Sequence, residues 1–357
     1  YKKSLEQLGY YEIIEKLREC ALTESAKKKI EIMEPILSET VLRKSQQETT
    51  QARQMIELVG TPPLPTMVNV EEYVNRALRG EMLLPEQLEE MGLFFNAVRR
   101  LKSYLKRGEE ARINIAYYNQ NLNVLGELVE ELERCIRGGR VDDYASPYIK
   151  DVRRQIQQAE EKISEKAEQA LRSNKAYLSD SFVVTRDGRL CIPVKREHKG
   201  KVAGSVVDRS STGATLFVEP KTVASLQEEL EIYRLEEDAE ERRILYTLTN
   251  LVAEGEQDIR EDIRVIEKLD FFFARGKLSI QMHAVEPEIR LDHQIRLTQA
   301  RHPMLDPQTC VPLDFEIGGD IRGVVITGPN TGGKTVALKT VALMCAMGCS
   351  GLHVPCE

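Results

Sequence analysis

The residues with the clearest chemistry form one short run, from Gly328 to Thr335. The run reads Gly-Pro-Asn-Thr-Gly-Gly-Lys-Thr and fits the GxxxxGK[ST] pattern of a phosphate-binding loop. Its glycines allow backbone N–H groups to converge on phosphate oxygens, and the N-terminus of a following helix adds its positive end. The pattern therefore predicts a binding site for a nucleoside triphosphate.

Two side chains of this loop have expected roles. We expect the ammonium group of Lys334 to reach the β- and γ-phosphates and to act in catalysis, and the hydroxyl of Thr335 to bind Mg²⁺. The predicted cofactors are therefore ATP and Mg²⁺. The residues expected to contact the nucleotide are Gly328, Pro329, Asn330, Thr331, Gly332, Gly333, Lys334, Thr335 and Val336.

The segments on either side of the loop support this interpretation. The β-branched run Gly323–Thr327 predicts a strand, and Val336–Met344 has apolar residues at helical spacing. A hydrolase also needs a Walker B acid on a neighbouring strand. The 23 residues after Lys334 suffice for one helix and the beginning of a strand at Leu352–Val354, and no such acid is found. We therefore expect this chain alone to hydrolyse ATP poorly or not at all.

The composition limits the class of the whole chain. Its 357 residues exceed the usual size of one hydrophobic core, and 30% charged against 6% aromatic residues favours long amphipathic helices. A net charge of −7 excludes a uniformly basic nucleic-acid binder. The seven cysteines contain no CxxC pair, so buried thiols in a reducing, cytoplasmic setting are expected. No apolar run is long enough for a membrane helix, and no membrane partner is expected.

Hydrophobic periodicity divides the chain into parts. Narrow apolar seams at alternating spacings of three and four residues begin at Ile149 and again at Val223, which is typical of a coiled coil. The parts expected are a helical core over 1–144, an outgoing lever helix over 145–180, a β module over 181–220, a returning lever helix over 221–280 and the first portion of an ATPase domain over 281–357.

The β module differs from the rest of the chain in pattern and in charge. Four short strands are predicted, at 182–185, 190–194, 202–207 and 214–218, with a hairpin turn at Asp187-Gly188. Two interpretations remain open: contact with a phosphate backbone, or an ordinary solvated sheet rim. The basic residues that would make the contact are Arg186, Arg189, Lys195, Arg196, Lys199, Lys201 and Arg209.

Two motifs together resemble the MutS family. The loop begins with Gly328-Pro-Asn, as in that family's Walker A motif, and Ala300-Arg-His-Pro303 resembles the element that opens its ATPase domain. The resemblance implies a multidomain, mainly α fold. That fold has a helical core, a long antiparallel coiled-coil lever, a small inserted β clamp and the beginning of an α/β P-loop (ABC-type) ATPase domain.

Further residues resemble the second bacterial branch of the family, MutS-II. They are Thr331, Thr335 and the segment Asp208–Pro220. The resemblance implies the N-terminal part of an ATP-dependent homodimer that binds branched DNA and suppresses homologous recombination. The alternative it leaves open is an ATPase that binds rRNA and splits stalled or collided ribosomes. The endonuclease activity of this branch belongs to a C-terminal Smr domain that the chain lacks.

Other functions are not expected. The mismatch-repair branch carries an N-terminal Phe-x-Glu element, and we interpret Phe217-Val-Glu219 as a coincidental match on the last strand of the β module. His302 lacks a suitably spaced Asp or Ser, so a structural role is expected. The stretch at Val311-Pro312, which corresponds to the family's adenine-contacting residues, has no aromatic residue to stack on an adenine. A coiled-coil protein of the SMC or Rad50 type fits poorly, because its phosphate-binding loop precedes the coil.

Overall fold

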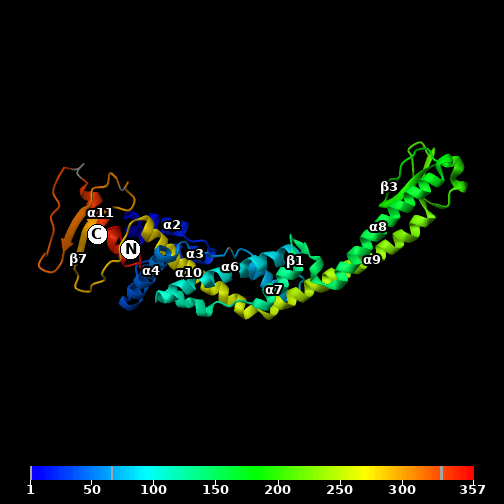
Figure 1. The fold of residues 1–357 in the computed structure, drawn as a ribbon. Helices are drawn as coiled ribbons and strands as arrows, with labels where there is room; N and C mark the ends of the chain where they lie inside the picture. Colours follow the sequence, from blue (N-terminus) through cyan, green and yellow to red (C-terminus); the bar gives the residue numbers. More distant parts are fainter. Residues whose placement is uncertain (1, 66, 307, 330–332) are drawn as a thin grey trace. The chain divides into compact units, whose positions relative to one another are not determined.

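The computed structural model describes residues 2–65, 67–306, 308–329 and 333–357, and these are mainly helical, as predicted. The chain divides into two compact units. The first unit contains Tyr1–Val74, Met91–Gly126 and Glu254–Glu357, and the second contains Asn75–Glu90 and Glu127–Ala253. Figure 1 gives the element labels used below.

The first unit is built around two long helices, α4 and α10. α4 is Glu39–Val59 and α10 is Glu256–Gln281. Gly276 of α10 allows their close approach, because a Cβ atom there would lie 2.8 Å from the backbone nitrogen of Arg53. The other elements in or entering this unit are α1 (Lys2–Gln7), α2 (Tyr10–Glu19), α3 (Glu24–Glu31), α5 (Val70–Leu78), α6 (Pro85–Glu110), η1 (Asn114–Asn121), β7 (Ile295–Ala300), β8 (Leu313–Ile317) and α11 (Lys334–Gly348).

A buried carboxylate of α10 fixes the start of α3. The Asp270 side chain accepts hydrogen bonds from the backbone N–H groups of Leu22, at 2.9 Å, and Thr23, at 2.6 Å. Thr23 in turn caps α3, because its Oγ1 accepts from the N–H of Ala26 at 3.2 Å. Distant parts of the sequence thus converge on α10.

The second unit pairs two helices that run side by side to a small sheet (Figure 1). α8 is Pro147–Ser173 and α9 is Lys221–Glu254. Ala159, Ile163 and Ala167 of α8 pack with Val223 and Leu230 of α9. The other elements of the unit are α7 (Gly126–Cys135), β1 (Ile136–Arg137), β2 (Arg140–Val141), η2 (Asp143–Ala145), η3 (Lys175–Tyr177), β3 (Val184–Arg186), β4 (Arg189–Lys195), η4 (Arg196–Lys201), β5 (Gly204–Arg209) and β6 (Thr215–Pro220).

The four strands expected in the β module form one antiparallel sheet in the order β3-β4-β6-β5. Asp187 and Gly188 connect β3 to β4 with φ angles of 48° and 75°, the positive values that a type I′ hairpin turn requires. Ile192, Val194 and Val218 are buried at the centre of the sheet. The sheet therefore has its own small core.

Two details of the predicted helices and strands are wrong. The segment 221–280 is not one helix, because α9 ends at Glu254 and α10 begins at Glu256. The run Gly323–Thr327 is not a strand: no strand pairs with it within the described ranges, and Val325 is 88% exposed. β-branched residues favour a strand only when a sheet edge is present to pair with it.

The segment after α11 forms a single β-bridge. Val354 pairs with Val285 in antiparallel orientation, with backbone N···O distances of 2.8 and 3.0 Å.

All seven cysteines are free, and Cys20, Cys135 and Cys191 are buried. Among the residues that the structure describes, no helix combines the length and the apolar character that crossing a lipid bilayer requires.

Candidate nucleotide-binding loop and nucleic-acid interface

The N-terminal half of α11 presents an exposed helix start to solvent. Gly333, just before the helix, has φ of 76°, in the left-handed region that glycine tolerates best. The backbone N–H groups of the first turn, from Lys334 to Val336, have no acceptor within the helix. Thr335 and Val336 are exposed. This end of α11 therefore offers N–H donors and the positive pole of the helix to an anion.

The described part of the loop folds back on this helix start. Lys334 Nζ donates a hydrogen bond of 2.6 Å to the carbonyl oxygen of Gly328, whose φ is 145°. The expected nucleotide contacts Gly328, Pro329, Gly333, Lys334, Thr335 and Val336 lie in this described part. The expected contacts Asn330, Thr331 and Gly332 lie outside the described residues.

The other end of α11 is held in the core by side chains of α4. Gln46 Nε2 donates to the carbonyl oxygens of Gly348, at 2.7 Å, and Leu352, at 2.9 Å. Thr49 Oγ1 donates to the carbonyl oxygen of Gly351 at 2.6 Å. Gln46 and Thr49 are both buried, so these bonds satisfy carbonyl groups that water does not reach.

A buried histidine extends this anchor to α10. His353 Nδ1 lies 2.7 Å from the Ser279 hydroxyl of α10, and Nε2 lies 2.9 Å from the Thr50 hydroxyl of α4. Burial, assisted by the positive charges of Arg53 and Arg275, lowers the pKa of His353 to about 4. The imidazole is therefore neutral at pH 7 and joins two helices through hydroxyl groups.

His302 has a structural role. Its Nδ1 accepts a hydrogen bond of 3.2 Å from the backbone N–H of Met304, and burial lowers the pKa of the ring. The Lys16 ammonium donates to the carbonyl oxygen of the next residue, Pro303, at 3.3 Å. The Arg301 backbone N–H donates to Pro355 at 3.0 Å. These bonds connect the segment to α2 and to the residues after α11, and no Asp or Ser side chain in the described ranges bonds to the ring.

Two of the seven basic residues in the β module are neutralised by carboxylates. Arg186 Nε lies 3.3 Å from Asp208 Oδ2, and Arg189 Nη1 lies 2.9 Å from Glu219 Oε2. Lys199 is occupied differently, because its Nζ donates to the Gly204 carbonyl oxygen at 3.0 Å. Within the part of the chain that the structure describes, no ion pair involves the remaining four, Lys195, Arg196, Lys201 and Arg209.

Strand register separates the basic residues along the sheet. Lys195 lies opposite Thr215 and Arg209 opposite Leu216, so both stand at one end of the sheet. Arg196 Nη1 would lie 3.8 Å from a Cβ atom at Gly213, in the turn at that same end. Arg189 lies at the other end of β4, roughly 20 Å away at the rise of a β-strand. We call Lys195, Arg196 and Arg209 the basic end of the β module.

The Phe217-Val-Glu219 tripeptide is part of the packing of the β module. Phe217 is buried, and the guanidinium of Arg186 lies 4.3 Å from its ring centroid. Glu219 is only 1% exposed and is paired with Arg189. A ring and a carboxylate that are covered in this way do not face a DNA base pair, which agrees with our interpretation of the match as coincidental.

Sequence comparison places the chain among known proteins. The proteins named Endonuclease MutS2 of Alkaliphilus oremlandii and Bacillus velezensis are 37% and 35% identical to it over 361 and 362 aligned residues. Both alignments cover 100% of this chain. The chain belongs to the MutS2 family. A third member, from a Geobacillus species, is 36% identical over 99% of the chain, whereas no family model matches.

The alignments also define how much of a MutS2 protein the chain represents. It spans 46% of the length of these three relatives. The name Endonuclease MutS2 describes the relatives as endonucleases. The described residues of this chain supply the exposed start of α11, the anchor of α11 in the core and a basic end on a small sheet.

Proposed function

We propose that this chain is the nucleotide-binding and nucleic-acid-binding part of an ATP-dependent MutS-type ATPase. The exposed start of α11, with Lys334 beside the loop, carries the proposal. The Lys334 ammonium already bonds to an oxygen of the loop, so a phosphate oxygen can replace that carbonyl without moving the lysine far. ATP with Mg²⁺, when bound, supplies the phosphoryl chemistry. The first-turn N–H groups and Lys334 bind the phosphates, and Thr335 provides a hydroxyl for Mg²⁺.

The hydrogen bonds at the far end of α11 would transmit nucleotide binding to α4 and α10. Gln46 and Thr49 join the end of α11 to α4, and His353 joins it to α10. α10 is separated from α9 only by Gly255. We propose that a displacement of α11 on nucleotide binding acts on α10, which Gly255 connects in sequence to α9, and that α8 and α9 form a coiled-coil lever.

The proposal for the whole protein is a homodimer that binds branched DNA and suppresses homologous recombination, with the endonuclease outside this chain. The sequence offers no Walker B acid, so we expect the chain alone to bind ATP but to hydrolyse it poorly.

The first experiment tests nucleotide binding by the whole protein. Lys334→Ala removes the charge opposite the phosphates and is expected to weaken binding of a labelled ATP analogue by about 100-fold. Lys339→Ala is the matched control, because Lys339 is an exposed lysine of the same helix. Equal affinities of the two variants would refute the loop assignment.

A ribosome-binding ATPase is the second candidate function. Lys195, Arg196, Lys201 and Arg209, which form no ion pair with the residues that the structure describes, suit phosphates of DNA or of rRNA, because phosphate contacts carry no sequence information. Affinities for a four-way DNA junction and for ribosomes, compared at matched salt, decide between the two. Tighter binding to ribosomes would replace the recombination role by the ribosomal one.

The basic end of the β module has a separate test. Neutralising Lys195, Arg196 and Arg209 together to Gln is expected to reduce the salt dependence of nucleic-acid binding, by about one unit of slope for each phosphate that the protein no longer neutralises. Arg186→Gln is the control, since Asp208 already neutralises that charge. An unchanged slope in the triple variant would make the sheet rim purely structural.

A further inference from the structure

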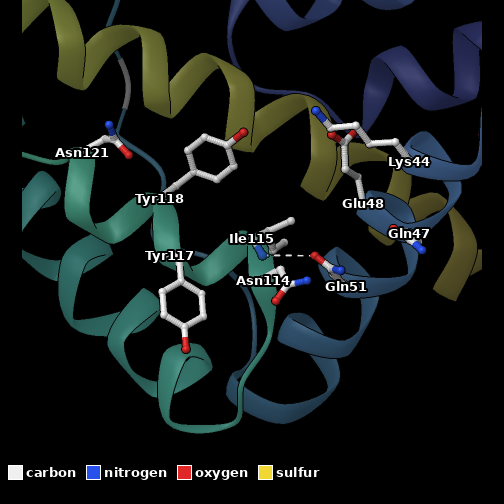
Figure 2. Close-up of a pocket in the computed structure, with 9 residues that line it drawn as sticks. All are labelled: Lys44, Gln47, Glu48, Gln51, Asn114, Ile115, Tyr117, Tyr118 and Asn121. Carbon is white, nitrogen blue, oxygen red and sulfur yellow. Dashed lines mark hydrogen bonds between the residues drawn. The ribbon is translucent and has the colours of Figure 1, made fainter. Parts of the chain in front are cut away.

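A pocket of about 380 Å³ lies in the first unit, between α4 and η1 (Figure 2). None of its lining residues belongs to the nucleotide-binding loop or to the β module. Its volume is at the small end of the range typical of ligand pockets. The lining combines two tyrosines with several carboxamide side chains and one lysine.

The two tyrosines differ in their surroundings and exposure. The ring of Tyr118 is held by Phe272, at a centroid distance of 6.0 Å, and by the Lys268 ammonium, 4.8 Å from its centroid. The neighbouring Tyr117 is 44% exposed, and Figure 2 shows its ring directed away from that of Tyr118. An exposed aromatic face beside a pocket is a surface on which a planar ring can stack.

The polar groups are arranged to bind the edge of such a ring. Gln51 Oε1 accepts a hydrogen bond of 3.1 Å from the backbone N–H of Ile115, which fixes its carboxamide and leaves Nε2 as a donor (Figure 2). Asn114 adds a second carboxamide to the lining. A carboxamide carries donor and acceptor groups side by side, as does the hydrogen-bonding edge of a nucleobase.

The charges around the pocket favour an anionic group at its rim. Glu48 lines the pocket, but its carboxylate pairs with the fully buried Arg275 at 3.0 Å. Lys44 is exposed on the same helix, and within the described ranges it forms no ion pair. The uncompensated charge at the rim is therefore positive.

We propose that this pocket binds one unpaired nucleobase of a DNA or RNA strand. Tyr117 stacks on the base, Gln51 and Asn114 bind its edge, and Lys44 contacts the adjoining phosphate. The inference rests on the proposed nucleic-acid-binding function and adds to it a preference for strands with unpaired bases.

The experiment uses the whole protein and a duplex that contains a short single-stranded gap. A second duplex carries abasic residues in the gap, so that only the bases are removed. The native protein is expected to bind the base-containing gap about tenfold more tightly than the abasic one. Tyr117→Ala should abolish that difference, and Tyr117→Phe should retain it, because the ring without its hydroxyl still stacks. Tyr246→Ala is the control, since Tyr246 is 48% exposed on α9 and does not line the pocket.

The outcomes separate this inference from the function on which it rests. If Tyr117→Ala keeps the full difference between base-containing and abasic gaps, the pocket proposal is wrong, and the proposed nucleic-acid binding stands. If the native protein binds neither gap, fully paired duplex nor ribosomes, both proposals fail. A second arm of the experiment uses single-stranded RNA with the sequence of the gap, once with its bases and once abasic. The difference in affinity between the base-containing and the abasic strand is then compared for DNA and RNA. The nucleic acid for which Tyr117→Ala reduces this difference more is the ligand.

Discussion

The two ends of the helix α11 lie in opposite environments. At its start, Thr335, Val336 and Leu338 are exposed, and the first-turn N–H groups have no acceptor within the helix. At its end, Leu343 and Met347 are fully buried, and the carbonyl groups that follow are bonded to side chains of α4. One end is open to a ligand and the other is fixed in the core.

This difference explains how one short helix can serve both binding and response. In the proposed function, phosphate binds at the open end of a helix whose far end is joined to α4 and α10 by directional hydrogen bonds rather than by apolar contact alone. Such bonds lose most of their energy when their geometry changes. The hydrogen bonds at the buried end therefore limit how far α11 can move relative to α4 and α10.

The largest expected effect compares one glycine at each end. Gly333 and Gly351 have nearly equal φ angles, 76° and 77°. A Cβ atom at Gly351 would lie 2.0 Å from Ser45 Oγ, whereas nothing lies within 4 Å at Gly333. Gly351→Ala should lower the free energy of unfolding by about 4 kcal/mol, from strain and overlap together. Gly333→Ala should cost about 1 kcal/mol, from strain alone.

Urea unfolding of both variants measures the contrast. Equal losses would show that the buried end of α11 adjusts as readily as the open end, and the idea of a fixed anchor would fail. A loss confined to Gly333→Ala would reverse the assignment of the two ends.

The open end could be predicted from sequence, because its chemistry is local. Eight consecutive residues specify the loop, and the glycine before the helix and the lysine that begins it are found where the pattern places them. The strand expected at Gly323–Thr327 is absent because strand formation depends on a neighbouring strand, which no local pattern encodes. The same limit applies to α9 and α10, whose continuous seam does not reveal the break at Gly255.

The buried end could not be predicted, because its partners are distant in sequence. Gln46 and Gly348 are hydrogen-bonded although about 300 residues separate them, and nothing in the α4 sequence marks Gln46 as a core residue. His353 offered a weak signal, as a polar residue between the apolar Leu352 and Val354. In the β module, the number of basic residues was evident, but the pairing of Arg189 with Glu219 was not.

The second prediction uses pH to probe the buried end. The pKa of His353 is about 4 in the folded protein and about 6.5 when the chain is unfolded. Between these values the unfolded chain binds a proton that the folded protein does not, so stability falls as the pH is lowered from 6.5 toward 4. This loss of stability amounts to about 3 kcal/mol and is absent above pH 7. His353→Gln should remove it.

The measurement is the difference in unfolding free energy between native protein and variant, followed across pH. The difference is needed because burial raises the pKa of Asp262 to about 7, which makes stability fall as pH rises from about 4 to 7. His283→Gln, at an exposed position outside the network, is the matched control. If His353→Gln and the native protein have parallel pH profiles, His353 is not held neutral by the core.

The smallest effect expected is that of one hydroxyl group at the anchor. Thr49→Val keeps the volume of the side chain but leaves the carbonyl of Gly351 without its 2.6 Å donor, and should cost about 1.5 kcal/mol. Thr340→Val on α11 is the matched control, because the hydroxyl of this equally buried threonine bonds only to the Val336 carbonyl of its own helix. That carbonyl keeps its helical N–H partner, so the control should lose less than half as much. Equal losses would mean that the Thr49 bond is no stronger than an ordinary local bond and contributes nothing particular to the anchor.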